Sequence, residues 1–290
     1  MSKKIIAVTG RNGQLGSELY LLQPDYSRYN WNFTDNDEMD LKNADEINAY
    51  FEKVQPDFFI NCAAYTAVDK AEYDKENAYA INATAVKLIA ENCKKYNTKL
   101  IQISTDYVFN GNGIRPYLPD EPTEPVNYYG FSKREGERLA LENNPDTIVL
   151  RSAWIYSSFG KNFVKTMLHL MNTRSEISVV HDQTGSPTYA HDLAKAIMEI
   201  ISTEKVHRGI YHFTNEGVVS WFDFAVAIRD FCGLNCTVNP IATAQFPTPA
   251  KRPAYSVLDK FSLQKTFGIE LIDWKNSLEK CLACINNTVN

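Results

Sequence analysis

The sequence has few cysteines and no long apolar run. Its six cysteines are scattered over 290 residues, which excludes a small disulfide-bonded scaffold. Cys281 and Cys284 form a C-x-x-C motif with no second pair, so we interpret them as reduced helix residues and not as a redox or zinc site. No apolar stretch approaches the roughly 20 residues that span a bilayer, and the one at the start is too short for a signal peptide. We therefore expect a cytoplasmic protein.

Blocks of basic charge are missing as well. The formal net charge is −5, and lysines and arginines occur at most in short pairs. Nucleic-acid binders need clustered basic residues for their phosphate contacts, so this class is excluded. With 44% hydrophobic and 22% charged residues, the chain has the balance of an ordinary globular protein and is long enough to bury a large core.

Short apolar runs alternate with helical patterns through the first half of the chain. The expected strands cover 4–10, 29–35, 57–65, 99–109 and 147–156. The expected helices cover 44–54, 75–97 and 129–144, and another carries Leu15, Leu19 and Leu22. Strands alternating with helices indicate βαβ units, and near-continuous apolar strands are buried on both faces. The sequence predicts an α/β fold with a doubly wound, parallel, Rossmann-type sheet.

The pattern changes after Arg151. A helix over 160–173, a strand over 176–180 and a helix over 220–233 are expected, and a Pro-rich loop leads to the final helices. A helix at 191–201 and a strand at 209–215 look like further parts of the main sheet.

These patterns predict two domains. Residues 1–153 would bind a dinucleotide, and the chain would return to that domain at about 187–214. Residues 154–186 and 215–290 would form a smaller, discontinuous substrate domain of the C-terminal part.

Three glycines stand at the first strand–helix junction, in "AVTGRNGQLGSEL". Gly10, Gly13 and Gly16 recur every third residue. A strand, a glycine-rich turn and a helix form the phosphate-binding turn of a dinucleotide fold, where glycine permits close approach of the backbone to the pyrophosphate. The spacing differs from the commoner G-x-G-x-x-G, and a purely structural turn is the alternative.

A second constellation is more specific. "STDYVF" ends the strand at 99–109, and Tyr129 and Lys133 follow as Y-x-x-x-K. At i and i+4 on a helix the two side chains share a face. A lysine at that distance is expected to lower the pKa of the phenol, which makes Tyr129 a usable general acid or base. The Thr105 hydroxyl, at the end of a parallel strand, can hold a substrate oxygen beside it.

With these motifs, the chain resembles the extended short-chain dehydrogenase/reductase family. The resemblance extends through "CAAYTAVDKAE", "STDYVFNG", "YYGFSK", "RSAWIYSSFGKNF", "DQTGSPTY" and "TPAKRP", in that order. It implies reduction, by NADPH or NADH, of the C4 ketone of dTDP-6-deoxy-L-lyxo-4-hexulose to dTDP-L-rhamnose. It also implies a dTDP-sugar as partner, and neither nucleic acid nor membrane.

The resemblance implies roles for particular residues. Thr105, Tyr129 and Lys133 would be catalytic, and Asn82 would support the proton relay or be a plain polar helix residue. The implied cofactor-binding residues are Gly10, Arg11, Asn12, Gly13, Gln14, Leu15, Gly16, Asp35, Asp40, Leu41, Ala63, Ala64, Tyr65, Thr66, Tyr129 and Lys133. The implied substrate-binding residues are Thr66, Thr105, Asp106, Tyr107, Trp154, Asn162, Lys165 and Arg252. Trp154 would stack on the sugar, with a purely structural aromatic as the alternative.

Two details leave alternatives open. Asp35 would accept a hydrogen bond from a ribose 2′-hydroxyl, whereas Arg11 would pair with a 2′-phosphate, so the sequence does not choose between NADH and NADPH. Some relatives form dimers bridged by magnesium through glutamates; Glu18 fits this pattern, but His191 stands where a carboxylate is expected. We therefore predict no bound metal and either a monomer or a homodimer.

Two other functions compete with this reading. Regulatory subunits such as the one attached to methionine adenosyltransferase keep the fold without catalysis, but here the residues Thr105, Tyr129, Lys133 and Trp154 are all present. Epimerases and dehydratases of nucleotide sugars are the second alternative. Dehydratases carry an acid–glutamate pair after the strand, whereas this chain has Asp106 followed by Tyr107.

Overall fold

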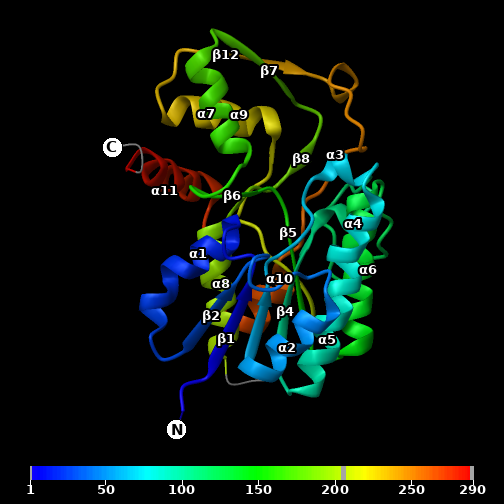
Figure 1. Cartoon of the computed structure of the whole chain (residues 1–290). Helices are drawn as coiled ribbons and strands as arrows, with labels where there is room; N and C mark the ends of the chain where they lie inside the picture. The colour runs from blue at the N-terminus through cyan, green and yellow to red at the C-terminus, as the bar shows by residue number, and fades with distance from the viewer. Residues whose placement is uncertain (1, 204–206, 288–290) are drawn as a thin grey trace.

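The computed structural model, which describes residues 2–203 and 207–287, is built on a six-stranded parallel sheet (Figure 1). The strands run in the order β10-β5-β4-β3-β1-β2. Their bounds are β1 Ile5–Thr9, β2 Asn30–Thr34, β3 Phe58–Asn61, β4 Lys99–Thr105, β5 Ile148–Ser152 and β10 Gly209–His212. The order reverses beside β1, because β2 lies on one side of it and β3 on the other. The predicted doubly wound sheet is confirmed.

Helices cover both faces of this sheet, as the alternation of side chains along its strands requires. Ile6 and Val8 of β1 pack in a core with helices α1 (Gln14–Leu22) and α8 (Ala190–Ser202). Ala7, between them, packs in a second core under α2 (Ala44–Val54) and α5 (Ala85–Lys95). Helix α6 (Tyr128–Asn143) lies beside α5 on that second face (Figure 1).

A smaller lobe stands above the carboxyl ends of the sheet strands (Figure 1). Its elements are β6 Ile155–Tyr156, α7 Phe163–Thr173, β7 Glu176–Val180, β8 Thr184–Gly185, β9 Thr188–Tyr189, β11 Val219–Ser220, α9 Trp221–Phe231, β12 Thr237–Ile241 and α11 Trp274–Asn287. Strands β7 and β12 pair in parallel, and α7, α9 and α11 share one apolar core. Between the segments of this lobe, α8 packs on α1 and β10 pairs with β5 of the main sheet. The ends of the predicted domain ranges at residues 1 and 288–290, and residues 204–206, lie outside the described residues.

Short elements complete the chain. They are α3 Val68–Ala71, α4 Lys75–Tyr79, α10 Phe261–Phe267, the 3-10 turns η1 Gln23–Tyr26, η3 Asp106–Val108 and η4 Thr243–Gln245, and the π-helical turn η2 Ala80–Thr84. The helix predicted over 75–97 is found as a continuous helical run through α4, η2 and α5, with one π-helical turn in its middle. The strand predicted over 147–156 is interrupted, since Trp154 has a φ of 49° and separates β5 from β6.

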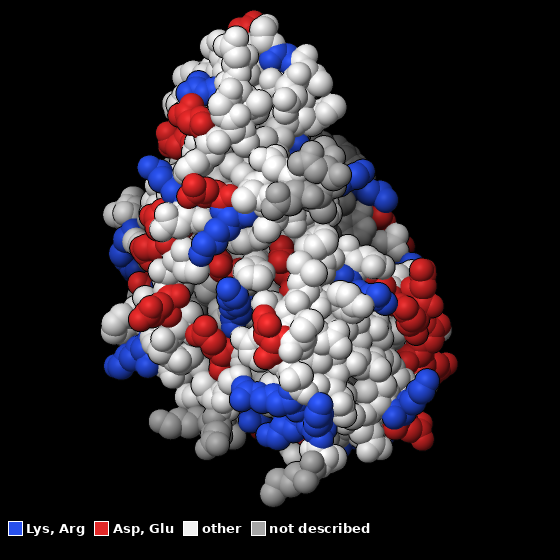
Figure 2. All heavy atoms as spheres, turned by 90° about the vertical axis from the view of Figure 1, so that its left-hand side faces the viewer, with Lys and Arg blue, Asp and Glu red and all other residues white. Residues whose placement is uncertain are grey.

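Charges of both signs cover the surface that Figure 2 shows. Acidic and basic side chains are interspersed over most of this face, and lysines and arginines gather at its lower edge. Within residues 2–203 and 207–287, no helix combines the length and the apolar character needed to cross a membrane.

Candidate active site

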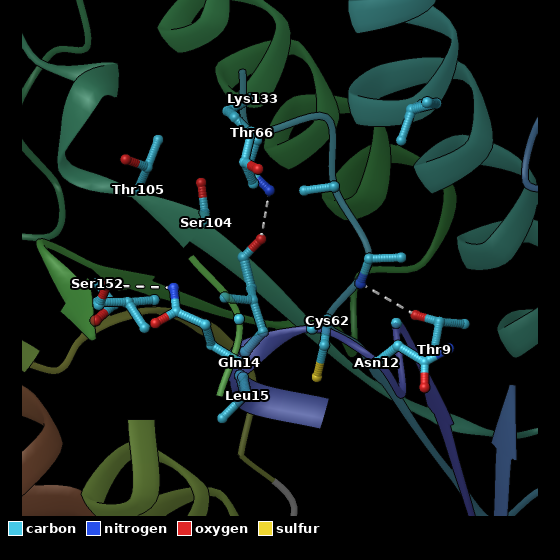
Figure 3. Close-up of a pocket in the computed structure, with 18 of the residues that line it drawn as sticks. Thr9, Asn12, Gln14, Leu15, Cys62, Thr66, Ser104, Thr105, Lys133 and Ser152 are labelled. Atoms are coloured by element: carbon cyan, nitrogen blue, oxygen red, sulfur yellow. Dashed lines mark hydrogen bonds between the residues drawn. The ribbon is translucent and has the colours of Figure 1, made fainter. Parts of the chain in front are cut away.

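A cavity of about 800 Å³ opens at the carboxyl ends of the sheet strands, below the smaller lobe. The glycine turn after β1, the ends of β2, β3 and β4, and helix α6 form its lower walls. Trp154, Lys161 and Trp221 line it from the smaller lobe. Figure 3 shows side chains from these separate strands converging on one space. A topological switch point beside β1 is where α/β sheets bind their ligands.

Gly10 and Gly16 of the glycine turn have no room for a side chain. Gly10 has a φ of +69°, and a Cβ there would lie 3.0 Å from the backbone nitrogen of Ala63. A Cβ on Gly16 would lie within van der Waals overlap of the Gly10 carbonyl. Gly13 is the N-cap of α1 and has no side-chain cap, so the first N–H groups of the helix are left for another partner. This bare, uncapped helix start fits the pyrophosphate of a dinucleotide.

Most of the predicted site residues line this one cavity. Those are Gly10, Asn12, Gly13, Gln14, Leu15, Asp35, Asp40, Leu41, Ala63, Ala64, Thr66, Thr105, Asp106, Tyr107, Tyr129, Lys133 and Trp154. The predicted residues outside its lining are Arg11, Gly16, Tyr65, Asn162, Lys165 and Arg252. Among residues that the sequence analysis missed, Ser104, Lys161 and Trp221 line it too. The Ser104 hydroxyl is buried and has no hydrogen-bond partner within the described chain, as expected of a group that meets a ligand.

The three predicted diphosphate contacts have protein partners instead. Arg252 forms a two-pronged ion pair with Asp69, at 2.9 and 2.8 Å. The Lys165 ammonium donates to the carbonyl of Ser158 at 3.0 Å, and the Asn162 side chain caps α7. No sequence pattern signals the pair of Asp69 and Arg252, because 183 residues separate them. The roles predicted for Asn162, Lys165 and Arg252 on the diphosphate stay predictions.

The candidate proton donor is buried among polar groups. The ring of Tyr129 packs edge-on against Tyr107, at a centroid distance of 5.6 Å. The Thr105 hydroxyl donates to Asp106 Oδ1 at 2.9 Å and accepts from the Tyr107 backbone N–H at 3.2 Å. Burial raises the pKa of Asp106 to about 6. At the end of β4, the hydroxyl of Thr105 is held by hydrogen bonds, and the carboxyl of Asp106 has a raised pKa; both lie near the phenol of Tyr129.

The pKa of Tyr129 differs from the expectation. Burial raises it, although a hydrogen bond with Thr105 opposes this. Lys133 is not among the groups that shift it, and the Lys133 ammonium donates to the Ile103 carbonyl at 2.7 Å (Figure 3). The pKa of Lys133 is itself lowered to about 8 by burial, while the Glu137 carboxylate raises it. The Y-x-x-x-K spacing predicts that both side chains share a face of α6, but it does not indicate how deeply Tyr129 is buried, and this burial sets the direction of its pKa.

Asn82 connects three parts of the site wall. Its side chain exchanges two hydrogen bonds with the Tyr65 backbone, at 2.9 and 3.0 Å, and donates to the Ser132 hydroxyl at 3.0 Å. It stands in the π-helical turn η2, which shifts the register of the helix at this point. Asn82 thus joins the loop after β3 to α6, one residue from Lys133.

Two tryptophans form one stacked pair at the top of the cavity. The rings of Trp154 and Trp221 lie 3.6 Å apart at 9° to each other. Trp154 also contacts β8, since a Cβ on Gly185 would come within 2.7 Å of its ring. Trp221 begins α9, directly after the capping residue Ser220. The sequence analysis placed Trp221 only in an amphipathic helix, because the pairing of β8 with β11 that brings it to Trp154 is long-range.

The two residues predicted to choose the cofactor lie apart. Asp35 lines the cavity, and its carboxylate accepts from the backbone N–H groups of Asn12 and Asn36, each at 2.8 Å. The Arg11 guanidinium lies over the ring of Tyr20, 5.0 Å from its centroid.

Glu18 and His191 contact each other at the junction of the two lobes. His191 Nδ1 lies 3.2 Å from Glu18 Oε2, and the Ser157 hydroxyl donates to Glu18 Oε1 at 2.5 Å. In residues 2–203 and 207–287, no group of three or more His, Cys, Asp or Glu side chains could hold a metal ion.

Comparisons with known proteins agree on one family. The family model of the RmlD substrate binding domain matches residues 3–287. The dTDP-4-dehydrorhamnose reductase of Aggregatibacter actinomycetemcomitans is 42% identical over 288 residues, with 96% of this chain and 98% of the relative covered. The spore coat polysaccharide biosynthesis protein SpsK of Bacillus subtilis is 38% identical, with 96% of each chain covered.

Solved structures give the same result. A dTDP-4-dehydrorhamnose reductase from Clostridium acetobutylicum is 40% identical, with a TM-score of 0.94 and 97% and 99% of the two chains covered. The enzyme of that name from Bacillus anthracis, solved in complex with NADP, is 37% identical with a TM-score of 0.93, over 97% and 99% of the chains. The UDP-glucose 4-epimerase of Thermus thermophilus, at 17% identity and a TM-score of 0.81, shares the fold.

Proposed function

Because the chain belongs to the RmlD substrate binding domain family, we propose that it reduces the C4 ketone of a dTDP-linked 6-deoxy-4-hexulose. It is an oxidoreductase that uses NADP or NAD. The observation that carries the proposal is the convergence of the glycine turn, Thr105, Tyr129 and Lys133 on one cavity. The substrate we assign is dTDP-6-deoxy-L-lyxo-4-hexulose and the product dTDP-L-rhamnose.

The bare glycine turn, the cavity and the unpartnered Ser104 hydroxyl fit a dinucleotide. Gly10 and Gly13 would admit its pyrophosphate, and Asp35 would bind its adenosine ribose. Lys133 would bind the nicotinamide ribose. When bound, the reduced nicotinamide supplies the hydride.

Tyr129 holds the proton that the alkoxide needs. Its raised pKa keeps the phenol protonated at neutral pH, the form required of a general acid. We propose that the Tyr129 hydroxyl donates to the developing C4 alkoxide and that the Thr105 hydroxyl positions that oxygen. The proton leaves a buried group, so a nearby positive charge is needed to stabilise the phenolate. Lys133 is the buried cation available one helical turn away.

The rate of turnover is expected to fall as pH rises through about 8, because Lys133 is cationic below its pKa of about 8 and neutral above it. The measurement is the pH profile of kcat. Lys133→Arg is the matched variant, since arginine keeps its charge throughout this range. It should be slower but should not share the alkaline fall. A wild-type rate that stays level well above this pH would remove Lys133 from the proposed role.

Trp154→Ala and Trp221→Ala are each expected to raise the KM for the sugar nucleotide about two- to tenfold, the worth of one aromatic contact. The dinucleotide Kd should stay unchanged, because neither tryptophan belongs to the glycine turn or to the helix that follows it. Trp31→Phe is the control, since Trp31 does not line the cavity. Weaker dinucleotide binding with an unaltered sugar KM would contradict this division of the site.

This division is part of the proposal. Residues 1–153 with 187–214 would provide most of the dinucleotide site, and residues 154–186 with 215–290 most of the sugar-nucleotide site. The position of Trp154 and Trp221 above the glycine turn supports it. We also propose a cytoplasmic location, supported by the free thiols of Cys62, Cys93, Cys232 and Cys236.

The stoichiometry of the reaction tests the proposed function. With freshly made dTDP-4-keto-6-deoxy sugar, one equivalent of NADPH or NADH should be oxidised for each sugar reduced, as followed by nicotinamide absorbance and product chromatography. Conversion of the sugar without net oxidation would favour an epimerase or dehydratase. Binding of the dinucleotide without conversion of any nucleotide sugar would favour a regulatory subunit.

A further inference from the structure

One side chain of the glycine turn ties the two lobes together. Gln14, the first residue of α1, donates from Nε2 to the Ile155 carbonyl at 3.3 Å and accepts at Oε1 from Asn162 Nδ2 at 3.0 Å. Figure 3 shows Gln14 inside the cavity. Between these two contacts the chain forms a loop, residues 157–162, that belongs to the smaller lobe. Gly160 of this loop has a φ of +65°, and a Cβ there would lie 3.1 Å from Gln14 Cγ.

A second anchor lies one turn further along α1. The buried Glu18 carboxylate accepts from the Ser157 hydroxyl at 2.5 Å. Asn162 closes the loop from its other end, because its Nδ2 also donates to the Ser157 carbonyl at 2.7 Å. The loop 157–162 is therefore hydrogen-bonded to α1 at its start and at its end, and Gly160 in its middle lies close to Gln14.

The loop presents Lys161 to the cavity. Lys161 is exposed and lines the cavity next to Gly160. The other cationic residue of the lining, Lys133, is buried and donates to the Ile103 carbonyl. Within the described chain, Lys161 has no hydrogen bond or ion pair, whereas Lys165 and Arg252 are both engaged. Among the described residues that line the cavity, Lys161 is thus the cation that is available to bind an anion, and the same cavity contains the uncapped start of α1.

We propose that Lys161 binds the pyrophosphate of the dinucleotide from the smaller lobe, and that Gln14 is the positioning residue that holds the loop 157–162 over it. This inference rests on the proposed function. A nucleoside diphosphate sugar offers the same chemistry, but the contact of Gly160 with Gln14 places the loop at the glycine turn. Binding of the dinucleotide would then hold in place the part of the cavity lining that runs from Trp154 to the loop 157–162.

The test is the Kd of NADPH and NADH, by fluorescence or calorimetry, with dTDP as the second probe. Lys161→Ala is expected to weaken binding of the dinucleotide about three- to tenfold, as for a charge-assisted contact made by an exposed side chain, and to leave the Kd of dTDP within about twofold. Lys161→Arg should restore most of this affinity. Lys94→Ala is the matched control, because Lys94 is exposed on α5 and does not line the cavity.

Gln14→Met tests the positioning role. It keeps the length of the side chain but removes both hydrogen bonds, so it should weaken the dinucleotide by a similar factor. In the double variant of Gln14→Met and Lys161→Ala, the second change should weaken dinucleotide binding little further, because the loop 157–162 has already lost its position. Independent, additive effects would overturn the role of Gln14.

The remaining outcomes separate this inference from the proposed function. If Lys161→Ala leaves the dinucleotide Kd unchanged, or weakens the binding of dTDP alone, the inference is overturned. Normal turnover by the wild type still supports the proposed function in that case. Failure of the wild type to bind either dinucleotide overturns both.

Discussion

Replacement of Tyr129 by Phe is expected to lower kcat by about 10²–10⁴-fold, the usual contribution of a general acid. The variant loses only the hydroxyl, and the ring keeps its edge-on contact with Tyr107. Folding and dinucleotide binding should therefore stay close to those of the wild type. The measurements are kcat under saturating substrate, the thermal midpoint and the dinucleotide Kd.

Tyr128→Phe serves as the control for this result. Tyr128 is the neighbour of Tyr129 on α6, packs on Phe131 and does not line the cavity. It should retain nearly full activity. A Tyr129→Phe enzyme with near-normal turnover would mean that another group supplies the proton.

Gly13→Val is expected to weaken dinucleotide binding by at least about a hundredfold, the equivalent of one or two charge-assisted hydrogen bonds. Gly13 lines the cavity at the uncapped start of α1, where helix N–H groups would meet the pyrophosphate. A branched side chain there would hold the phosphate away from these groups. The measurement is the Kd, with the thermal midpoint as the check on folding.

Gly13→Ala gives the graded comparison. Its single Cβ would lie 3.2 Å from the Gly10 carbonyl oxygen, a close but tolerable contact, so its loss of affinity should be smaller. If the Gly13→Val protein folds and its dinucleotide Kd is unchanged, the glycine turn has only a structural role.

The local patterns of the sequence were sufficient to predict the sheet and the common face of Tyr129 and Lys133 on α6. The run 57–65 is mostly apolar, and the i, i+4 spacing of Tyr129 and Lys133 fixes their common face. The ends of parallel strands are where an α/β sheet meets its ligands, so Thr105 was expected to lie beside the substrate. Each of these inferences needs only residues that are close in sequence, or the general geometry of the fold.

What the sequence did not reveal depends on long-range packing. Trp221 reaches Trp154 through the pairing of β11 with β8, and Arg252 is engaged by a carboxylate from α3. The direction of the Tyr129 pKa follows from burial by the whole site. The interruption at Trp154 is a backbone conformation that is uncommon outside glycine and has no signal in an apolar run.

In the proposed reaction, a hydride from the reduced nicotinamide reaches C4 of the sugar as the product is formed. The most direct test uses NADPH or NADH deuterated at C4 of the nicotinamide, in both stereochemical forms, with dTDP-4-keto-6-deoxy sugar and this protein. The product should carry one deuterium at its C4, from one of the two forms, as seen by mass spectrometry and proton NMR. A product without deuterium from either form would contradict the account.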